Sequence, residues 1–331
     1  MLEKTPDKEL NHHIDRLCEL FQLGQIEKVV LEVTPLLKQF PTSIALYNIK
    51  GISCWHLKKF AEAIKTYKKA LEIDPESPIT YFNLGVALQD CDQLDEALEN
   101  YEIALSKNPH YLDPIFNTGI ILQKRGDFAS AINYFRKATQ IEPEDPKAYL
   151  NLGIALQKSG RLDHALKNYK IALSKRPDYL DAIFNIGTVL EKMFIIPTAI
   201  NYFNRALKLE PNHVPSLLQL GKIQNKMGQL KTATRTFRKA CKYDCETKIS
   251  KINLGSLLCS QGTFDEGLAS LEAAVGINFN DVTGHSSILF HSNYSPYSSA
   301  EEVYSYYQRF DDLFSRKFSH KWSPHNNSRG K

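Results

Sequence analysis

Long apolar runs are missing from this sequence of 331 residues. No segment approaches the ~18–20 consecutive apolar residues that a membrane-spanning helix needs. The start of the chain is charged and contains no apolar stretch of the kind found in secretory signal peptides. We therefore expect a cytoplasmic protein that makes no contact with a membrane.

Residue patterns typical of disulfide scaffolds, metal centres and catalytic sites are also scarce. Six cysteines are scattered along the chain, so we expect free thiols in a reducing compartment. Cys241 and Cys245 lie one helical turn apart, but no second cysteine or histidine pair accompanies them, and we expect no metal site. No glycine-rich phosphate loop, strand pattern or nucleophile with a base partner is recognisable. The sequence predicts a protein that is not an enzyme and holds no cofactor.

The charge balance is mild. A formal net charge of +4 is too small to indicate nucleic-acid binding unless the basic residues form a local patch. Hydrophobic content of 43% and charged content of 24% are ordinary for a soluble globular protein. We expect proteins, not nucleic acids, as partners.

What the chain does contain is one spacing of small residues and proline, repeated five times in register. In one copy Gly85 is followed by Ala97, Ala104 and Pro109, and the other copies keep the same offsets. The glycines recur at a constant interval, at Gly51, Gly85, Gly119, Gly153 and Gly187. This spacing resembles the tetratricopeptide repeat family, whose unit is a helix–turn–helix of roughly 34 residues.

The small residues and the proline have physical roles in such a unit. Two helices approach closely only where side chains are small, and we expect Gly85 on the first helix to face Ala97 on the second. Ala104 leaves room for the next unit, and Pro109 ends the second helix because it lacks an N–H and clashes with the preceding turn. The resemblance implies an all-α, right-handed superhelical solenoid of about seven to eight units, ending in a capping helix.

The repeat pattern weakens toward both ends, which suggests domain boundaries. We expect a flexible leader over 1–9, the solenoid over 10–292 and a linker over 293–298. Ser298 and Ser299 each precede a glutamate by three residues, a helix-start pattern, so a capping or docking helix is predicted over 299–319. Residues 320–331 are expected to form a flexible tail.

A row of primary amides recurs two residues before the glycine position. In the resembled family the first helix of each unit lines a concave groove. There an amide can pair with both the C=O and the N–H of an extended peptide. Asparagine at this position is also frequent in such repeats without any binding role, and that alternative stays open. The predicted peptide-binding amides are Asn83, Asn117, Asn151, Asn185, Gln219 and Asn253.

A row of lysines follows five residues after the glycine position. It indicates a basic edge of the groove that would favour acidic stretches in a partner; the alternative is a solvated face without a binding role. The lysines are Lys124, Lys158, Lys192 and Lys226.

Two aromatic features indicate further docking points. Phe194 lies in a turn where other units have glycine or small polar residues, so it is either packed against a neighbouring turn or an exposed contact point. The last predicted helix carries an aromatic stripe at helical spacing that either covers the final repeat or binds another protein. The stripe consists of Val303, Tyr307, Phe310, Phe314 and Phe318.

The segment Asn293–Tyr304 has a narrower resemblance. Its pattern, Asn-Tyr-x-Pro followed by Ser-x-Glu-Glu and an apolar–aromatic pair, is similar to the segment joining repeats to catalytic domain in O-linked N-acetylglucosamine transferase-like proteins, SPINDLY-type relatives included. Residues 324–329 also look like the lead-in to that domain. In that family the asparagine row holds protein substrates. The nucleotide-sugar-binding domain is absent from this sequence, so we predict no transferase activity for it.

Three functions are compatible with these features. The first is a protein-interaction module that holds extended or flexible polypeptide in its groove and recruits substrates for a transferase-like protein. The second is a scaffold that assembles a complex through its convex face or its C-terminal helix. The third is a non-catalytic subunit of a glycosyltransferase, with a catalytic chain docked at the C-terminal helix.

Overall fold

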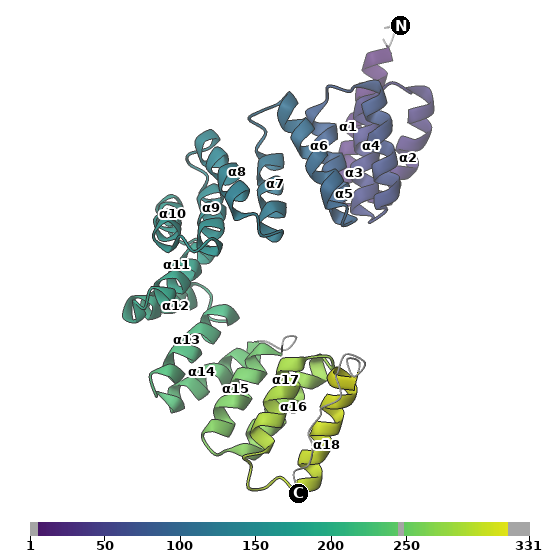
Figure 1. Cartoon of the computed structure of the whole chain (residues 1–331). Helices are drawn as coiled ribbons and strands as arrows, with labels where there is room; N and C mark the ends of the chain where they lie inside the picture. The colour runs from purple at the N-terminus through teal and green to yellow at the C-terminus, as the bar shows by residue number, and fades with distance from the viewer. Residues whose placement is uncertain (1–5, 244–247, 317–331) are drawn as a thin grey trace, which may run out of the picture. The chain divides into compact units, whose positions relative to one another are not determined.

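The computed structural model describes residues 6–243 and 248–316, and these residues form α-helices, one π-helical turn and no strand (Figure 1). The predicted all-α architecture is confirmed. Each helix packs chiefly against its neighbours in sequence, as a stack of repeated hairpins requires.

Eight helical hairpins follow one another along the described chain. Their first helices are α1 (Pro6–Gln22), α3 (Ile44–His56), α5 (Pro78–Asp90), α7 (Leu112–Lys124), α9 (Pro146–Lys158), α11 (Leu180–Lys192), α13 (Val214–Lys226) and α15 (Ile249–Ser260). Their second helices are α2 (Ile26–Gln39), α4 (Phe60–Ile73), α6 (Leu94–Lys107), α8 (Phe128–Ile141), α10 (Leu162–Lys175), α12 (Ile196–Leu209), α14 (Leu230–Tyr243) and α16 (Phe264–Ile277). The helices α17 (Val282–Ser292) and α18 (Ala300–Phe310) and the π-helical turn η1 (Asp311–Ser315) complete the fold.

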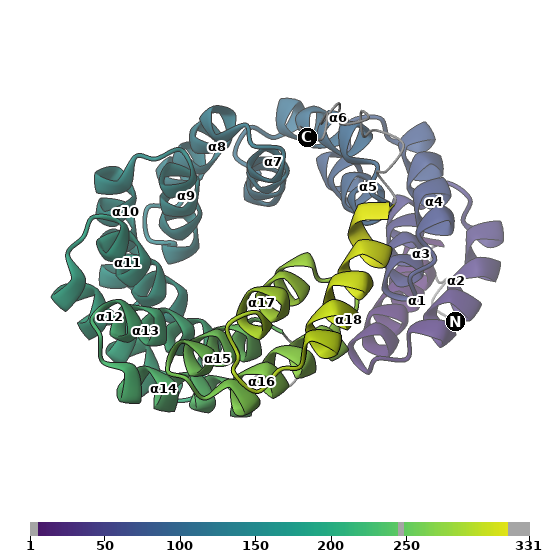
Figure 2. The same ribbon diagram turned by 60° about the horizontal axis from the view of Figure 1, so that its bottom comes forward.

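The chain divides into two compact units, Met1–Pro177 and Asp178–Lys331. Within each unit, some successive first helices touch one another, as α3 touches α5 and α13 touches α15. First helices therefore lie on the inner side of each unit's curve and second helices on the outer side. Figure 2 shows this for α9 inside and α10 outside in one unit, and for α17 inside and α16 outside in the other.

The ends of the helices follow the predicted stop signals. The second helices of the five regular repeats end two residues before a proline, as α6 does before Pro109. The turn between the two helices contains a residue with positive φ, which favours glycine because glycine has no Cβ. Glycine takes this conformation at Gly24, Gly126, Gly160, Gly228 and Gly262, and other residues take it at Lys58, Asp92 and Phe194.

The nearest neighbour of the glycine in a regular hairpin is a side chain that the spacing did not predict, whereas the expected contact between the two small residues is seen in the last hairpin, where a Cβ on Gly255 would lie 2.7 Å from Gly267 O. A Cβ on Gly85 would lie 2.5 Å from Cε1 of Tyr101, and one on Gly153 would lie 2.5 Å from Cε1 of Tyr169. The glycine thus makes room for an aromatic ring on the second helix, which points back toward the start of its own helix as long helical side chains do. The rings at this position are Tyr67, Tyr101, Phe135, Tyr169, Phe203 and Phe237, and all are buried.

One predicted boundary differs from the structure. Helix α1 begins at Pro6, inside the expected leader, since proline is well suited to a first helical turn. The regular part of the last helix ends at Phe310 and continues as η1, and the predicted end at 319 lies outside the described residues. Of its two possible starts, Ser299 is used: its Oγ accepts from Glu302 N at 3.1 Å, and Glu302 Oε2 accepts from Ser299 N at 2.9 Å. The predicted tail lies outside the described residues.

Candidate functional site

The six predicted amides lie on six different first helices. Asn83, Asn117 and Asn151 belong to α5, α7 and α9 of the first unit. Asn185, Gln219 and Asn253 belong to α11, α13 and α15 of the second. All six side chains are half-buried. Each unit therefore carries a row of three amides, one on each of three successive first helices.

These amides differ in the hydrogen bonds that their side chains already make. Asn151 Nδ2 donates to Lys147 O at 3.0 Å and Asn253 Nδ2 donates to Ile249 O at 2.9 Å, each within its own helix. The side-chain amides of Asn83, Asn185 and Gln219 make no hydrogen bond within the described residues. No described group donates to the side-chain oxygen of any of the six, so every acceptor in the two rows is available.

Asn117 is held by a buried hydrogen-bond chain. Its Nδ2 donates to the Tyr101 hydroxyl at 3.1 Å, and that hydroxyl donates to Gln89 Oε1 at 3.1 Å. Burial raises the pKa of Tyr101 above its usual value, although the hydrogen bond from Asn117 acts in the opposite direction. The phenol therefore stays protonated and fixes the orientation of the Asn117 amide.

The same chain is interrupted one repeat later. Tyr169 donates to Gln157 Oε1 at 2.7 Å, as Tyr101 does to Gln89, but the equivalent ring between them is Phe135. Without a hydroxyl there, Gln123 Oε1 is buried with no hydrogen-bond partner among the described residues. The hydrogen-bond chain lacks a donor at this point, and the spacing of small residues could not have predicted its absence.

Each predicted lysine is the last residue of a first helix. This places the cation where the unpaired carbonyls and the helix dipole favour positive charge. All four are exposed, and Lys226 Nζ lies 3.5 Å from Glu191 Oε1 of the preceding first helix. A helix-capping role accounts for their position, and a role in binding stays a prediction.

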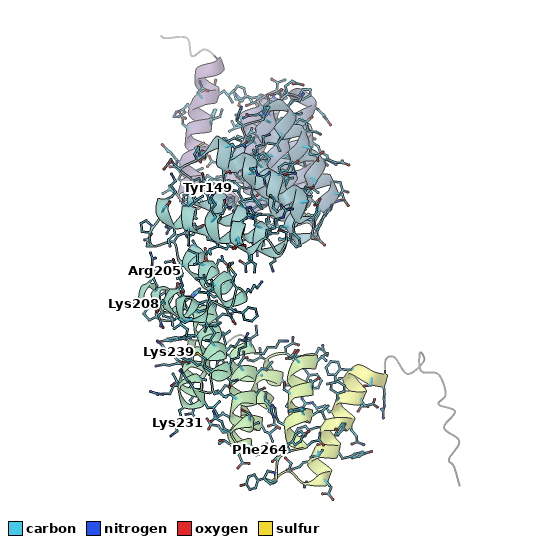
Figure 3. The ribbon with its side chains drawn as sticks, turned by 60° about the vertical axis from the view of Figure 1, so that its left-hand side comes forward. Tyr149, Arg205, Lys208, Lys231, Lys239 and Phe264 are labelled. Atoms are coloured by element: carbon cyan, nitrogen blue, oxygen red, sulfur yellow. The ribbon has the colours of Figure 1, made fainter. Side chains whose placement is uncertain are left out.

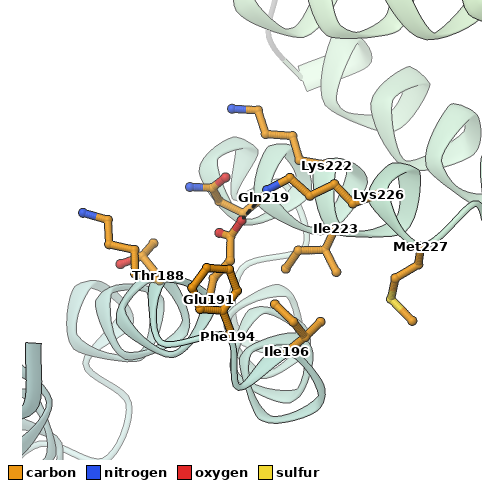
Figure 4. A pocket seen from close by; sticks show the side chains of 10 residues that line it. Thr188, Glu191, Phe194, Ile196, Gln219, Lys222, Ile223, Lys226 and Met227 are labelled. Carbon is orange, nitrogen blue, oxygen red and sulfur yellow. Dashed lines mark hydrogen bonds and ion pairs between the residues drawn. The ribbon is translucent and has the colours of Figure 1, made fainter.

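Phe194 is exposed and conformationally strained. Its side chain is 87% exposed, so the alternative of a ring packed against a neighbouring turn is wrong. Its φ is +60°, a value that is rare for bulky residues. It borders a pocket of about 800 Å³ between α11 and α13. Figure 4 shows Phe194 beside Glu191 and across the pocket from Ile223.

This pocket gathers predicted residues from three different patterns. Gln219 comes from the amide row, Lys192 and Lys226 from the lysine row, and Phe194 from the turn. In the sequence these residues belong to separate patterns. The spacing within each pattern does not reveal that the ends of α11 and α13 lie side by side. Lys222, Ile223 and Met227, also in the wall, were not predicted.

The predicted aromatic stripe of the C-terminal helix is half-buried against its own unit. The rings of Phe310 and Phe314 are 5.1 Å apart, and that of Phe314 is 5.4 Å from His285. Tyr306 packs on the core of the last repeat and donates to Glu272 Oε1 at 2.5 Å, whereas Tyr307 is exposed. These contacts favour the capping interpretation. They also replace one member of the predicted stripe, because Tyr306 and not Tyr307 packs on the last repeat. Phe318 lies outside the described residues.

Two surface features escaped the sequence interpretation. One is a group of exposed aromatic side chains on and between α17 and α18, which includes Phe290, Tyr294, Tyr297 and Tyr304. The other is a basic outer face: α12 and α14 contain basic residues and no acidic ones. Figure 3 shows Arg205 and Lys208 on α12 and Lys231 and Lys239 on α14.

Other classes of site find no support in the part of the chain that the structure describes. No group of three or more histidine, cysteine, aspartate or glutamate side chains is arranged to hold a metal ion. Over residues 6–243 and 248–316, no helix combines the length and the apolar character needed to traverse a bilayer.

Comparison with protein families gives matches to three models of one kind of repeat. A model described as TPR repeat matches residues 56–92 and 119–160. Two models described as tetratricopeptide repeat match residues 150–214 and 202–235. Comparison with the curated protein sequences gives no match.

Solved structures resemble the chain at low sequence identity. A tetratricopeptide repeat protein from Parabacteroides merdae ATCC 43184 is 16% identical with a TM-score of 0.58, over 74% of this chain and 96% of that one. A chain of the APC/C hetero-tetramer Cut9-Hcn1 is 15% identical with a TM-score of 0.58, over 88% of this chain and 56% of that one. YrrB, described as a TPR protein with an unusual peptide-binding site, is 23% identical with a TM-score of 0.49, over 56% and 95%. At these identities the likeness concerns the fold alone.

Proposed function

This chain is a tetratricopeptide-repeat protein, and we propose that it binds other proteins by holding extended polypeptide segments along the inner faces of its first helices. The repeat family implies a protein-interaction or scaffold role. One observation carries the finer proposal: a half-buried amide recurs at the same place on three successive first helices of each unit, with its side-chain oxygen unoccupied.

The strength of such binding follows from simple magnitudes. A hydrogen bond contributes about 0.5–1.5 kcal/mol net to the free energy of binding. No single amide therefore determines the affinity, and three together give a modest affinity. Helices pack about 10 Å apart, and an extended chain covers about 3.4 Å per residue. One amide therefore meets about every third residue of the bound segment. Because amides pair with backbone groups, the contact tolerates many sequences.

Substitution of one amide row tests the proposal. The first unit offers Asn83, Asn117 and Asn151, and the probe is a fluorescein-labelled glycine–serine dodecapeptide, which spans about 40 Å when extended. Replacing all three by alanine should weaken binding at least about tenfold, equivalent to about 1.4 kcal/mol, as measured by fluorescence anisotropy. Thermal unfolding should change little, because only the Asn117 side chain bonds outside its own helix.

A matched control comes from asparagines on the second helices. Asn100 and Asn168 donate to the carbonyl four residues earlier, as Asn151 does, but they lie on α6 and α10. Asn133 on α8 completes a control triplet. Replacing these three by alanine should leave peptide affinity unchanged. Equal losses in both triplets, or none in either, would contradict a role for the inner amides.

The basic outer face favours a second candidate function. Helices α12 and α14 carry seven basic residues without an acidic one: Arg205, Lys208, Lys231, Arg235, Arg238, Lys239 and Lys242. Arg238 is engaged with Glu266 at 2.7 and 2.9 Å, whereas Lys231, Arg235 and Lys239 make no ion pair among the described residues. A scaffold that contacts an acidic partner through this outer face would use these residues.

The similarity of residues 293–304 to the linker of O-linked N-acetylglucosamine transferase-like proteins supports a narrower form of the first proposal. In that form, the bound polypeptides are substrates for a catalytic domain or subunit that docks near α18. Tetratricopeptide repeats are generally non-catalytic, so we propose that this chain itself transfers no sugar.

A further inference from the structure

The turn before α12 contains a residue that the fold does not need. The same turn position, seven residues after the repeat glycine position, has positive φ in all eight hairpins. It is glycine in five of them, lysine in one, aspartate in one, and Phe194 in the turn before α12. A bulky residue with positive φ strains the backbone. The Phe194 side chain is 87% exposed, so its burial offsets little of that strain. Strain without a folding benefit points to a role in binding.

The surroundings of Phe194 form an apolar floor. Ile223 is 1% exposed at the base of the pocket, Ile196 lies at the start of α12, and Met227 is half-exposed at the end of α13. A pocket of about 800 Å³ lies within the range of about 300–1,000 Å³ typical of ligand sites. Such a floor accepts a large apolar side chain and releases water from both surfaces.

The rim of the pocket is basic. Lys192, Lys222 and Lys226 stand around it, against one carboxylate, Glu191. That carboxylate already pairs with Lys226 across the end of the pocket at 3.5 Å (Figure 4). Lys192 and Lys222 make no ion pair within the described residues, so the rim presents an excess of positive charge to an incoming segment.

We propose that this pocket binds a polypeptide segment in which one large apolar side chain is flanked by acidic residues. The apolar side chain packs between Phe194, Ile223 and Met227, and the acidic side chains face Lys192 and Lys222. This proposal rests on the proposed function, because the segment passes Gln219, a member of the second unit's amide row, as it enters the pocket. The pocket gives sequence preference to a surface that otherwise contacts backbone.

The experiment uses the full chain, two peptides and one substitution. Both labelled peptides are glycine–serine dodecapeptides, one with a central Glu-Leu-Glu and the other with a central Gln-Ala-Gln. The substitution is Phe194→Gly, which installs the residue found at five equivalent turns and should leave thermal stability equal or higher. We expect wild type to prefer the Glu-Leu-Glu peptide at least tenfold, and Phe194→Gly to remove this preference while binding Gln-Ala-Gln as before.

The matched charge variant is Lys192→Gln with Lys222→Gln. It should weaken binding of the Glu-Leu-Glu peptide and reduce the dependence of that binding on salt concentration. Lys231→Gln with Lys239→Gln, on the outer face, serves as the control and should change neither.

Each contrary outcome has a separate meaning. Equal affinity of wild type for both peptides, unaltered by Phe194→Gly, overturns the pocket proposal and leaves backbone binding intact. Binding of neither peptide to wild type overturns the proposed function together with the pocket. Self-association that Phe194→Gly abolishes in sedimentation, without a peptide preference, identifies a second copy of the chain as the occupant and also overturns the proposal.

Discussion

At the scale of single residues, an aromatic ring packs beside the repeat glycine in six of the hairpins, from Gly51 to Gly221. In two of them the ring is a tyrosine whose hydroxyl also donates to a glutamine, Tyr101 to Gln89 and Tyr169 to Gln157. Where it belongs to Phe135, the glutamine oxygen of Gln123 is left buried without a partner among the described residues. Leaving a buried acceptor unpaired destabilises the fold.

Phe135→Tyr should therefore stabilise the protein. The new hydroxyl would donate to Gln123 Oε1 in the arrangement already present in two neighbouring repeats, adding about 1 kcal/mol to the free energy of unfolding. Equilibrium denaturation in urea measures this change. In a Gln123→Met background, which lacks the acceptor, Phe135→Tyr should lose the gain. A destabilisation of equal size in both backgrounds would show that the ring site has no room for the hydroxyl.

The sequence predicted the positions of the small residues but not the aromatic ring that packs on the glycine in most hairpins. Spacing shows that a glycine recurs, whereas its contact depends on the direction in which the opposing side chains leave their helix. The ring of Tyr169 against Gly153 is an example. For the same reason, the exposure of Phe194 could not be decided from its position in a turn.

At the scale of elements, the first helices carry the predicted amides and lysines, and the final helices close the fold. Helix α17 starts at the N-cap Asp281, whose Oδ2 accepts from Gly284 N at 3.0 Å and whose Oδ1 lies 2.6 Å from Lys248 Nζ. Burial acts to raise the pKa of Asp281, but the hydrogen bonds from Lys248 and from the Gly284 and Thr283 backbone, together with the charge of Lys248, outweigh it and the pKa is lowered. The carboxylate thus fixes α17 against the preceding hairpin.

His285 makes the same region sensitive to pH. It is 4% exposed, and its Nε2–H donates to Phe279 O at 3.0 Å. Burial lowers its pKa and Arg309 adds to this effect, while the Phe279 carbonyl and Asp281 oppose it. Below about pH 6.5 the unfolded chain takes up a proton that the folded His285 does not, so stability falls as the pH drops from there toward the folded pKa.

Local opening of α17 and α18 should therefore become more frequent between pH 7.5 and pH 5.5, as measured by hydrogen exchange corrected for the intrinsic rate. His285→Gln keeps an amide donor for the Phe279 carbonyl and should remove part of this dependence. The remainder should come from His291, whose pKa is also lowered by burial. An identical pH dependence in the variant and in wild type would contradict this account.

The all-α class and the helix ends before the prolines followed from the sequence, because a proline stops a helix locally. The C-terminal region was harder to predict. Its stripe was placed on Tyr307, whereas Tyr306 packs on the last repeat, since the helix ends in a π-helical turn and its orientation is set by α17. Local spacing contains no information on that packing.

At the scale of the whole molecule, each of the two compact units carries three amides on its first helices, which lie on the inner side, and has its second helices on the outer side. The resemblance to the repeat family implied that first helices lie inside and second helices outside. The sequence analysis did not predict the basic residues that α12 and α14 carry on the outer side. The net charge of the whole chain is small and gives no information on a local excess of positive charge.

The measurement that most directly tests inner-face binding is hydrogen exchange of the full chain with and without a saturating glycine–serine dodecapeptide. We predict slower exchange in first helices, α5, α7 and α9 in one unit or α11, α13 and α15 in the other, with second helices unchanged. Protection confined to second helices such as α12 and α14 would contradict the account and place the partner on the outer face.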